Sequence, residues 1–389
     1  MTPRLAGLFL ANLLQASGAS LLLHLPAHLH NLGATEAQVG VLMAVGAFVT
    51  LAASPLLGHL LDRVSGRLLL ASAAAVAACS ALAFLLVLTV SPALVLLIIT
   101  IDLAVALLHA AFYHQALDQL APAERTRGIG LFGISSMAAV GLGALLGDVA
   151  LAALGPSGLF QLMALLLLTP LLLAALQPSR GASSGADPQA DPSAGGYFAA
   201  MTTRSLRPIW TVSLGFFVAM ASVFVFLKLT VSETGIGSLG LYFGIYTAVA
   251  IGLRLLAGTL PDRLGHERAA RWVLGSYASG FLVLGFGSSL MTFCLAAVLG
   301  GIGHGYGYPL LLSMATERVD PSRRGSAVTT FNAIDEGAVL LAAPAFGLLL
   351  ESGSPTLLYG AAAAAALAGA LPLLLSSTPV ANRPSDGSQ

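Results

Sequence analysis

The chain has 389 residues, of which 57% are hydrophobic and only 9% are charged, and its mean hydropathy is +0.89. Soluble domains carry about 25% charged residues, so this composition excludes an ordinary soluble protein and indicates one whose solvent is lipid. The net charge is zero and gives no information about partners. With about 20 residues needed for each helical span, the length allows roughly a dozen spans. Cys79 and Cys294 lie within apolar stretches, which predicts small packing side chains rather than a disulfide.

Twelve apolar stretches follow one another along the chain, and we expect each to form a membrane-spanning helix. Strands in lipid require a closed barrel whose residues alternate between polar and apolar, and these stretches do not alternate. The expected spans are residues 5–27, 37–60, 68–90, 93–117, 128–151, 157–177, 208–230, 238–261, 269–289, 291–315, 326–351 and 354–376. No small-residue cleavage site precedes the first stretch, so we expect a retained span rather than a removed signal peptide.

The spans divide into two groups of six. We expect an N-terminal six-helix bundle over residues 1–177, a cytoplasmic linker over 178–207, a C-terminal six-helix bundle over 208–377 and a disordered tail over 378–389. The linker is rich in Pro, Ser, Gly and Ala, which is typical of a flexible segment, and a short helix is expected near residues 196–203.

The basic residues indicate an orientation. All but two of the 17 Lys and Arg residues fall on one side of a twelve-span chain. Basic loops face the cytoplasm, so we expect a multi-pass protein of the inner cell membrane with both termini and the linker in the cytoplasm. The two exceptions, Lys228 and Arg254, lie inside spans. Arg254 is expected to snorkel to the cytoplasmic boundary, and Lys228 either to snorkel outward or to close an outer gate.

A short charged segment occurs twice, about 200 residues apart, at the end of the second apolar stretch of each half. Each copy has a Gly that is followed four residues later by Asp-Arg. The matching residues are Gly58, Asp62 and Arg63, with Arg67 further on, in the first copy, and Gly258, Asp262 and Arg263 in the second. A repeat of this period in so apolar a chain predicts two homologous membrane halves.

The repeated segment resembles the loop signature of the major facilitator superfamily, Gly-x-x-x-Asp-Arg-x-Gly-Arg-Arg/Lys, although Ser65 precedes the second Gly and Leu68 replaces a basic residue. Residues 122–128 and 321–325 resemble two further loops of the family, so the resemblance extends from about residue 5 to about residue 376. It implies an all-α membrane protein with the MFS fold, in which 12 transmembrane helices form two pseudo-symmetric six-helix bundles. It implies an efflux-type member that works by alternating access.

In that family, the Asp of the signature loop helps to hold a gate closed against the start of the eleventh helix. The resemblance assigns this role to Asp62, because Ser326 and Ala327 are expected to open a helix whose free N–H groups attract an anion. Asp262 is expected to do the same at the fifth helix, near Gly128. The alternative is that both segments carry only solvated charge that sets the orientation.

Ionisable side chains at membrane depth are costly and usually functional. The candidates for proton coupling are Asp102, His109, Asp335 and Glu336, and the candidates for lining a substrate cavity are Asn12, Gln15, Tyr113, His304, Tyr306 and Asn332. Asp102, His109 and Tyr113 follow one another at steps of seven and four, which places them on one stripe of a helix. The alternative for each candidate is a polar side chain that is satisfied by helix packing.

No catalytic motif occurs, so we expect a transporter and not an enzyme, with no cofactor apart from the proton as coupling ion. Residues 143–147 partly resemble the antiporter signature in the fifth helix of the superfamily, Gly-x-x-x-Gly-Pro-x-x-Gly-Gly, because they keep its first two glycines but are not followed by Pro. The resemblance favours proton-coupled export of a small organic molecule. One alternative is proton-coupled uptake of a polar metabolite. Another is transport of a transition metal or metal chelate, because the chain has eight His residues and few charged ones. His28-x-His30 lies near Glu36 and could bind a metal, but two His residues do not make a closed ligand set.

The expected partners are a small-molecule substrate and the lipid bilayer, without nucleic acid, and we expect a monomer. Only 7% of the residues are aromatic, so no aromatic stacking box is expected in the cavity.

Overall fold

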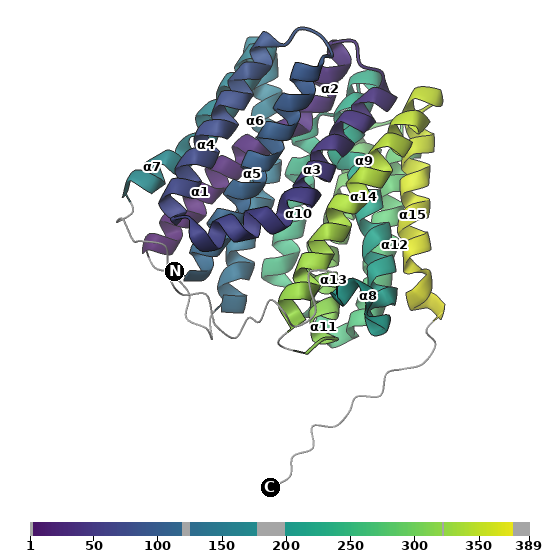
Figure 1. Cartoon of the computed structure of the whole chain (residues 1–389). Coiled ribbons are helices and arrows are strands. Elements are labelled where there is room, and N and C mark those ends of the chain that lie inside the picture. The colour runs from purple at the N-terminus through teal and green to yellow at the C-terminus, as the bar shows by residue number, and fades with distance from the viewer. Residues whose placement is uncertain (1–2, 119–124, 177–198, 321–322, 376–389) are drawn as a thin grey trace.

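The computed structural model describes residues 3–118, 125–176, 199–320 and 323–375, and all of their regular secondary structure is helical (Figure 1). Within these ranges, the side chains of residues 3–5, 58, 62, 116–118, 125–132, 173–176 and 199 lie outside the description. The N-terminal helices are α1 (Pro3–Ser20), η1 (Leu21–His24), α2 (Leu25–Asn31), α3 (Glu36–Arg63), α4 (Gly66–Ala83), η2 (Phe84–Leu86), α5 (Pro92–Asp118), α6 (Arg125–Leu167) and α7 (Thr169–Leu176). The C-terminal helices are α8 (Ala199–Thr202), η4 (Arg204–Leu206), α9 (Arg207–Thr234), α10 (Leu239–Leu256), α11 (Leu260–Leu264), α12 (His266–Phe286), α13 (Leu290–Glu317), α14 (Arg324–Ser352) and α15 (Pro355–Leu375).

These helices account for twelve membrane crossings in the described residues. Ten segments are long and apolar enough to span a membrane, and one of them, Gly133–Leu172, has 40 residues. A helix of that length measures about 60 Å, twice the thickness of the hydrocarbon core. Gly155 breaks it with φ 67° and ψ −164°, a conformation open essentially to glycine alone, so the segment crosses twice. The twelfth crossing is the 21-residue α12, whose first turns carry charged residues. The all-α fold with 12 transmembrane helices is therefore confirmed.

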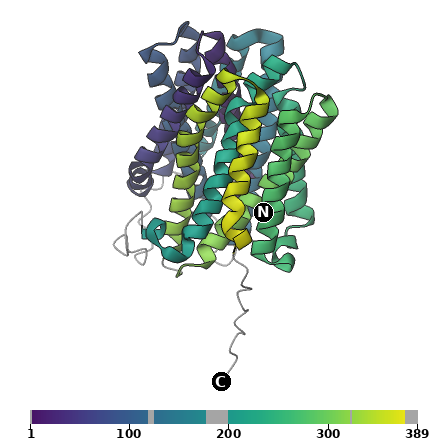
Figure 2. The same ribbon diagram turned by 90° about the vertical axis from the view of Figure 1, so that its right-hand side faces the viewer.

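The helices form two halves, with α1–α7 on one side of the molecule and α9–α15 on the other (Figure 1). Within the halves, α1 packs on α6, α4 on α5, α15 on α9, and α12 on α13 and α15. Figure 2 shows α14 and α15 together on the face of the C-terminal half. The two halves meet along α3 with α14 and along α6 with α10.

The two ends of the bundle differ. The start of α1, the end of α15, and the short helices α8 and α11 all lie at the lower end in Figure 1, which we call the linker end. The loops at the opposite end, which we call the far end, are closed by side-chain caps. The Thr35 hydroxyl accepts from the Gln38 N–H, and the Ser289 hydroxyl accepts from the Thr292 N–H. Such caps satisfy free N–H groups and fix where α3 and α13 begin.

Glycines allow the closest helix contacts. A Cβ atom added to Gly215 of α9 would lie 2.7 Å from Cα of Gly369 on α15, so the two backbones touch. The short helix expected near residues 196–203 is present as α8, and the indole N–H of Trp210 donates to the Ala200 carbonyl at 3.1 Å. The rest of the expected linker up to residue 198, and the tail from residue 378, lie outside the described residues.

Candidate functional site

A polar network joins α1, α5 and α6 in the N-terminal half. The Asn12 amide donates to the hydroxyls of Ser135 at 2.8 Å and Ser136 at 3.0 Å, and the Gln15 amide donates to the Asn12 carbonyl at 3.0 Å. Tyr113 on α5 also hydrogen-bonds Ser136. Asn12 and Gln15 are buried, and the Gln15 carbonyl oxygen has no partner among the described residues. The predicted cavity residues Asn12, Gln15 and Tyr113 therefore belong to one network.

Asp102 lies midway along α5 and faces the neighbouring α3. Its carboxylate occupies the place where a side chain on Gly46 would stand, so Gly46 makes room for it. Two turns further on, the rings of His109 and Tyr113 have centroids 4.9 Å apart, and His109 is exposed. Asp102 and His109 thus have different surroundings, although they share a stripe of the helix.

Three acidic side chains from the two halves approach one another. Asp102 of α5 interacts electrostatically with Glu336 of α14, and Glu336 interacts with its neighbour Asp335. No Lys or Arg within salt-bridge distance of the three carboxyls occurs among the described residues. The structure therefore brings together three of the four predicted coupling candidates, across the contact between α3 and α14.

A cluster of aromatic rings surrounds His304 of α13. The Tyr246 hydroxyl lies 2.6 Å from Nδ1 of His304 and 3.4 Å from the Tyr277 hydroxyl. The ring centroids of Phe216, Phe224 and Tyr308 lie 6.0, 6.1 and 6.2 Å from that of His304. The expectation that a low aromatic content leaves no stacking site was wrong for this half, because the few rings are concentrated on α9, α10 and α13.

The two remaining cavity candidates, Asn332 and Tyr306, have different surroundings. The Tyr308 hydroxyl donates to the Asn332 side-chain oxygen at 3.2 Å, which joins α13 to α14, and Asn332 is exposed. Tyr306 instead donates to the Ala257 carbonyl at 2.8 Å and is buried against the end of α10. The structure thus places His304 and Asn332 on either side of Tyr308, and Tyr306 away from them.

Arg254 of α10 bonds inside the protein rather than snorkelling to the boundary. Its Nε donates to the Gly305 carbonyl at 3.0 Å, and the side chain is half-buried. It interacts electrostatically with Tyr113 of the other half and with Tyr308. The expectation of snorkelling failed because Pro309, four residues after Gly305 in α13, has no N–H to donate to the Gly305 carbonyl, which leaves that carbonyl free to accept from the guanidinium.

An ion-pair cluster joins four elements at the far end. One oxygen of Asp148 on α6 accepts from Nζ of Lys228 at 2.8 Å and lies 3.1 Å from Nε2 of His24. The other accepts from the Gly240 N–H at 2.7 Å. Since Asp148 and His24 belong to the N-terminal half and the other two groups to the C-terminal half, the cluster closes the halves on each other. Outward snorkelling, the first expectation for Lys228, was wrong.

Asp148 is a functional residue that sequence reasoning missed, whereas Lys228 was a candidate for an outer gate. A usable signal was present, because Asp148 is the single carboxylate in its apolar stretch and Lys228 the single ammonium in its own. Two lone charges of opposite sign near the same face of a membrane are expected to pair.

A second contact between the halves at the far end joins α3 and α14 through backbone. Gly40 lies against the Ala343 carbonyl, Gly347 lies against the Glu36 carbonyl, and the Ala37 N–H donates to the Glu351 carboxylate at 3.1 Å. In Figure 1, α3 and α14 meet near their upper ends and run apart toward the linker end.

The signature segments are described in part. The surroundings of Gly58 and the side chain of Asp62 lie outside the description, so the Asp62 gate contact stays a prediction, as does that of Asp262 with the region near Gly128. In the structure, Asp262 lies 3.3 Å from Nε2 of His266 in its own half. His266 also pairs with Glu317 at 3.1 Å. The second segment, with Gly258 and Arg263, therefore ties α11 to α12 and α13.

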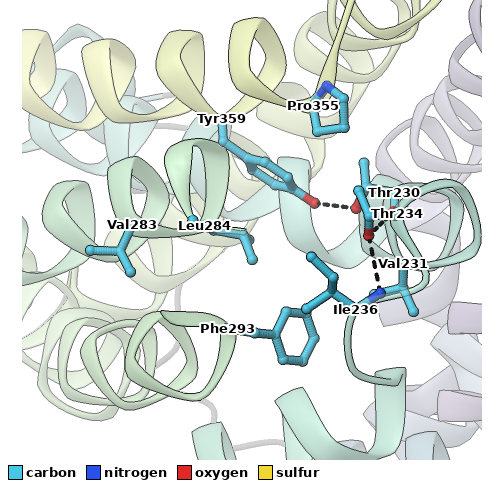
Figure 3. Close-up of a pocket in the computed structure, with 10 residues that line it drawn as sticks. Thr230, Val231, Thr234, Ile236, Val283, Leu284, Phe293, Pro355 and Tyr359 are labelled. Atoms are coloured by element: carbon cyan, nitrogen blue, oxygen red, sulfur yellow. Dashed lines mark hydrogen bonds between the residues drawn. The ribbon is translucent and has the colours of Figure 1, made fainter. Parts of the chain in front are cut away.

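Two smaller features lie apart from these groups. At the far ends of α9, α12, α13 and α15, a small apolar pocket is bordered by a 2.8 Å bond between Thr230 and Tyr359 (Figure 3). None of the residues that line it is a candidate for proton coupling or substrate binding.

Near α2, the His28 ring packs edge-on against Phe160 at 4.8 Å, whereas His30 lies 3.6 Å from Glu36. Since the two His rings have different neighbours, they do not converge on one ligand.

The sequence model of the Major Facilitator Superfamily matches residues 5–290 and 238–389. The chain belongs to this superfamily. An uncharacterized MFS-type transporter, YhhS of Salmonella paratyphi C (strain RKS4594), is 25% identical over 240 residues, which are 61% of this chain and 56% of that protein. The chain thus spans little more than half the length of the curated relatives it matches.

Solved structures of the Major Facilitator Superfamily share the fold. The nucleoside transporter NupG superimposes with a TM-score of 0.77 at 14% identity, covering 96% of this chain and 98% of that one. The human organic anion transporter MFSD10 (TETRAN) gives a TM-score of 0.67 at 16% identity, covering 96% and 100%. At these identities the likeness establishes the MFS fold alone, and that fold is confirmed.

Proposed function

We propose that this superfamily member is a secondary active transporter that exports a small organic molecule in exchange for protons. In the proposed orientation it lies in the inner cell membrane as a monomer, with the linker end in the cytoplasm and the far end outside. The observation that carries the proposal is the group of three carboxyls, Asp102, Asp335 and Glu336, contributed by both halves at membrane depth.

Like charges close together in a medium of low dielectric repel strongly, so protonation of one carboxyl relieves the others. The free-energy cost of ionising Asp102 therefore depends on how closely α5 and α14 approach each other. Opening and closing the halves changes the distance between these helices and therefore the proton affinity of the carboxyl. A coupling group needs a proton affinity that differs between the two states. Asp102 is the proposed coupling site, because it interacts electrostatically with Glu336 of the opposite half, whereas Asp335 and Glu336 share one helix.

The arrangement of the halves supports alternating access. At the far end, the Asp148–Lys228 pair and the close contact of Gly40 with Ala343 hold the halves together. Toward the linker end, α3 and α14 run apart (Figure 1). A molecule would enter from the cytoplasm in this conformation and leave after the far-end contacts open, as in transporters that rock around a midplane site.

The export direction rests on the glycines of the antiporter-like segment in α6. Gly143 lies against the backbone of Ser17, and Gly147 lies against the ring of His24, so both allow α6 to approach the first span closely. Uptake of a polar metabolite would use the same groups in the reverse direction. The separate surroundings of His28 and His30 give no support to metal transport.

The proposal predicts that Asp102→Asn abolishes substrate accumulation driven by a pH gradient but leaves exchange of labelled for unlabelled substrate intact, because exchange needs no net proton movement. Both modes are measured in proteoliposomes that contain the purified full chain, with a panel of candidate compounds and a pH-sensitive dye inside. The sign of the gradient that drives accumulation distinguishes export from uptake.

Asp335→Asn serves as the comparison, because Asp335 lies near Tyr277 and Tyr308 and is expected to act on substrate binding or packing. It should reduce both modes together. If Asp102→Asn concentrates substrate as well as the wild type does, Asp102 is a packing residue and the assignment is wrong.

A further inference from the structure

Arg254 is a cation within the protein whose charge has no counterpart beside it. Nε donates to the Gly305 carbonyl, and the two terminal amino groups have no partner among the described residues. No carboxylate of those residues lies within salt-bridge distance of Arg254. Its electrostatic neighbours are Tyr113, Tyr246 and Tyr308.

A cation that is removed from water is costly unless an anion compensates it. Because Nε is occupied, the guanidinium is held in one orientation, and its two remaining amino groups form the fork that binds a carboxylate or phosphate through two parallel hydrogen bonds. Arg271 of α12 gives a contrast, because it also donates to a backbone carbonyl, that of Leu373, but its side chain is exposed. The guanidinium of Arg254 is therefore more desolvated than that of Arg271 and has more to gain from binding an anion.

The groups around Arg254 come from both halves. Tyr113 belongs to α5, and Tyr308 and His304 belong to α13. His304 is also an electrostatic neighbour of Arg254, and the rings of His304 and Tyr308 are nearly parallel, with an interplanar angle of 29°. Flat rings that stack, beside a guanidinium with free N–H groups, suit a substrate with an anionic group on an aromatic ring.

We propose that Arg254 binds the anionic group of the transported molecule, a carboxylate, sulfonate or phosphate, while the aromatic part of that molecule lies against His304 and Tyr308. This inference rests on the proposed transport function and adds to it the class of substrate, an aromatic organic anion. Because Tyr113 of the other half lies near the guanidinium, a bound anion would bridge the halves on the linker side of the acidic group.

The test measures binding by the purified full chain through thermal unfolding at increasing ligand concentration. The probes are matched pairs that differ in charge: benzoate with benzamide, phenyl phosphate with phenol, and naphthoate with naphthamide. The wild type is expected to bind at least one anion about tenfold or more tightly than its neutral partner. Arg254→Gln should remove that preference, and the control Arg271→Gln should leave it unchanged.

Arg254→Lys separates binding from folding. Lys keeps the charge but lacks the planar fork, so the anion preference should persist while the dissociation constant for the anion rises about tenfold. If Arg254→Gln does not fold, this variant decides the question. The proposal is overturned if the wild type shows no preference in any pair, if Arg254→Gln keeps the preference, or if Arg254→Lys binds the anion as tightly as the wild type.

The failure of this inference is distinguishable from a failure of the transport proposal. Preferential binding of anions without proton-driven transport of any compound would contradict coupling and leave the Arg254 site standing. Proton-driven transport of neutral compounds without a preference for anions would contradict the Arg254 site and leave the transport proposal standing.

Discussion

Asp148 shows how one residue joins the two halves. Its carboxylate binds Lys228, His24 and the Gly240 N–H, and its side chain is 17% exposed, so water screens the charge only in part. Removal of one partner leaves the other charge without compensation, at a cost of about 1–3 kcal/mol for a partly buried group. In a transporter that alternates between two states, the loss of the ion pair therefore destabilises the state that is closed at the far end.

We predict that Asp148→Asn and Lys228→Met each shift the protein toward the state open at the far end. The reporter is Thr247→Cys in a chain without its own cysteines, because Thr247 is buried where α10 meets Gly141 of α6. Since 1.4 kcal/mol corresponds to a factor of ten, labelling by a membrane-impermeant thiol reagent from outside should become about tenfold faster.

Glu233→Gln is the control, because it removes one negative charge from an exposed side chain near the same end of α9. It should leave the labelling rate of Thr247→Cys unchanged. Wild-type labelling rates in both Asp148→Asn and Lys228→Met would show that the ion pair does not hold the far end closed.

At the scale of helices, α3 and α14 approach each other through glycine. Gly40 lies against the Ala343 carbonyl and Gly347 against the Glu36 carbonyl, so backbone meets backbone with no side chain between. Small residues allow such contacts between helices in membranes, where packing rather than the hydrophobic effect holds helices together. In the proposed alternating-access cycle, the same contact has to separate when the far end opens.

Gly40→Val is therefore expected to block closure of the far end, because the added methyl groups cannot fit against the backbone of α14. Substrate transport should fall to the background level, while labelling of Thr247→Cys from outside should increase. Gly244→Val on α10 is the matched control, since no atom lies within 4 Å of a Cβ added there, and it should transport normally. Normal transport by Gly40→Val would mean that closure does not require this contact.

At the scale of the whole molecule, the proposed orientation makes the linker end cytoplasmic. Single cysteines at Ser65, before α4, and at Ser354, before α15, lie at opposite ends of the bundle. In intact cells, impermeant reagent should label Ser354→Cys, and should label Ser65→Cys only after the membrane is opened. Cysteines at Ser184 and Ser322, which lie outside the described residues, should behave like Ser65→Cys. Labelling of Ser65→Cys in intact cells would reverse the orientation.

Hydropathy by itself determined the class of this protein and the places of its helices. The expected span 37–60 corresponds to α3, Glu36–Arg63, and the expected span 291–315 to α13, Leu290–Glu317. Such agreement is possible because the transfer of about 20 consecutive residues into lipid is a local property, which does not depend on what the helix touches. The duplicated Gly and Asp-Arg positions likewise indicated the superfamily, because each motif lies within one short segment.

Which side chains meet was decided only by the tertiary structure. Asn12 finds Ser135 and Asp148 finds Lys228 across separations of 123 and 80 residues. Arg254 turns inward because Pro309 cannot donate to the Gly305 carbonyl and so leaves it open to the guanidinium. Periodicity assigns a residue to a face of its own helix but not to a neighbouring helix. That choice depends on the packing of small residues between helices, and it turned an expected snorkelling Lys228 into an ion pair between the halves and gathered sparse aromatic residues around His304.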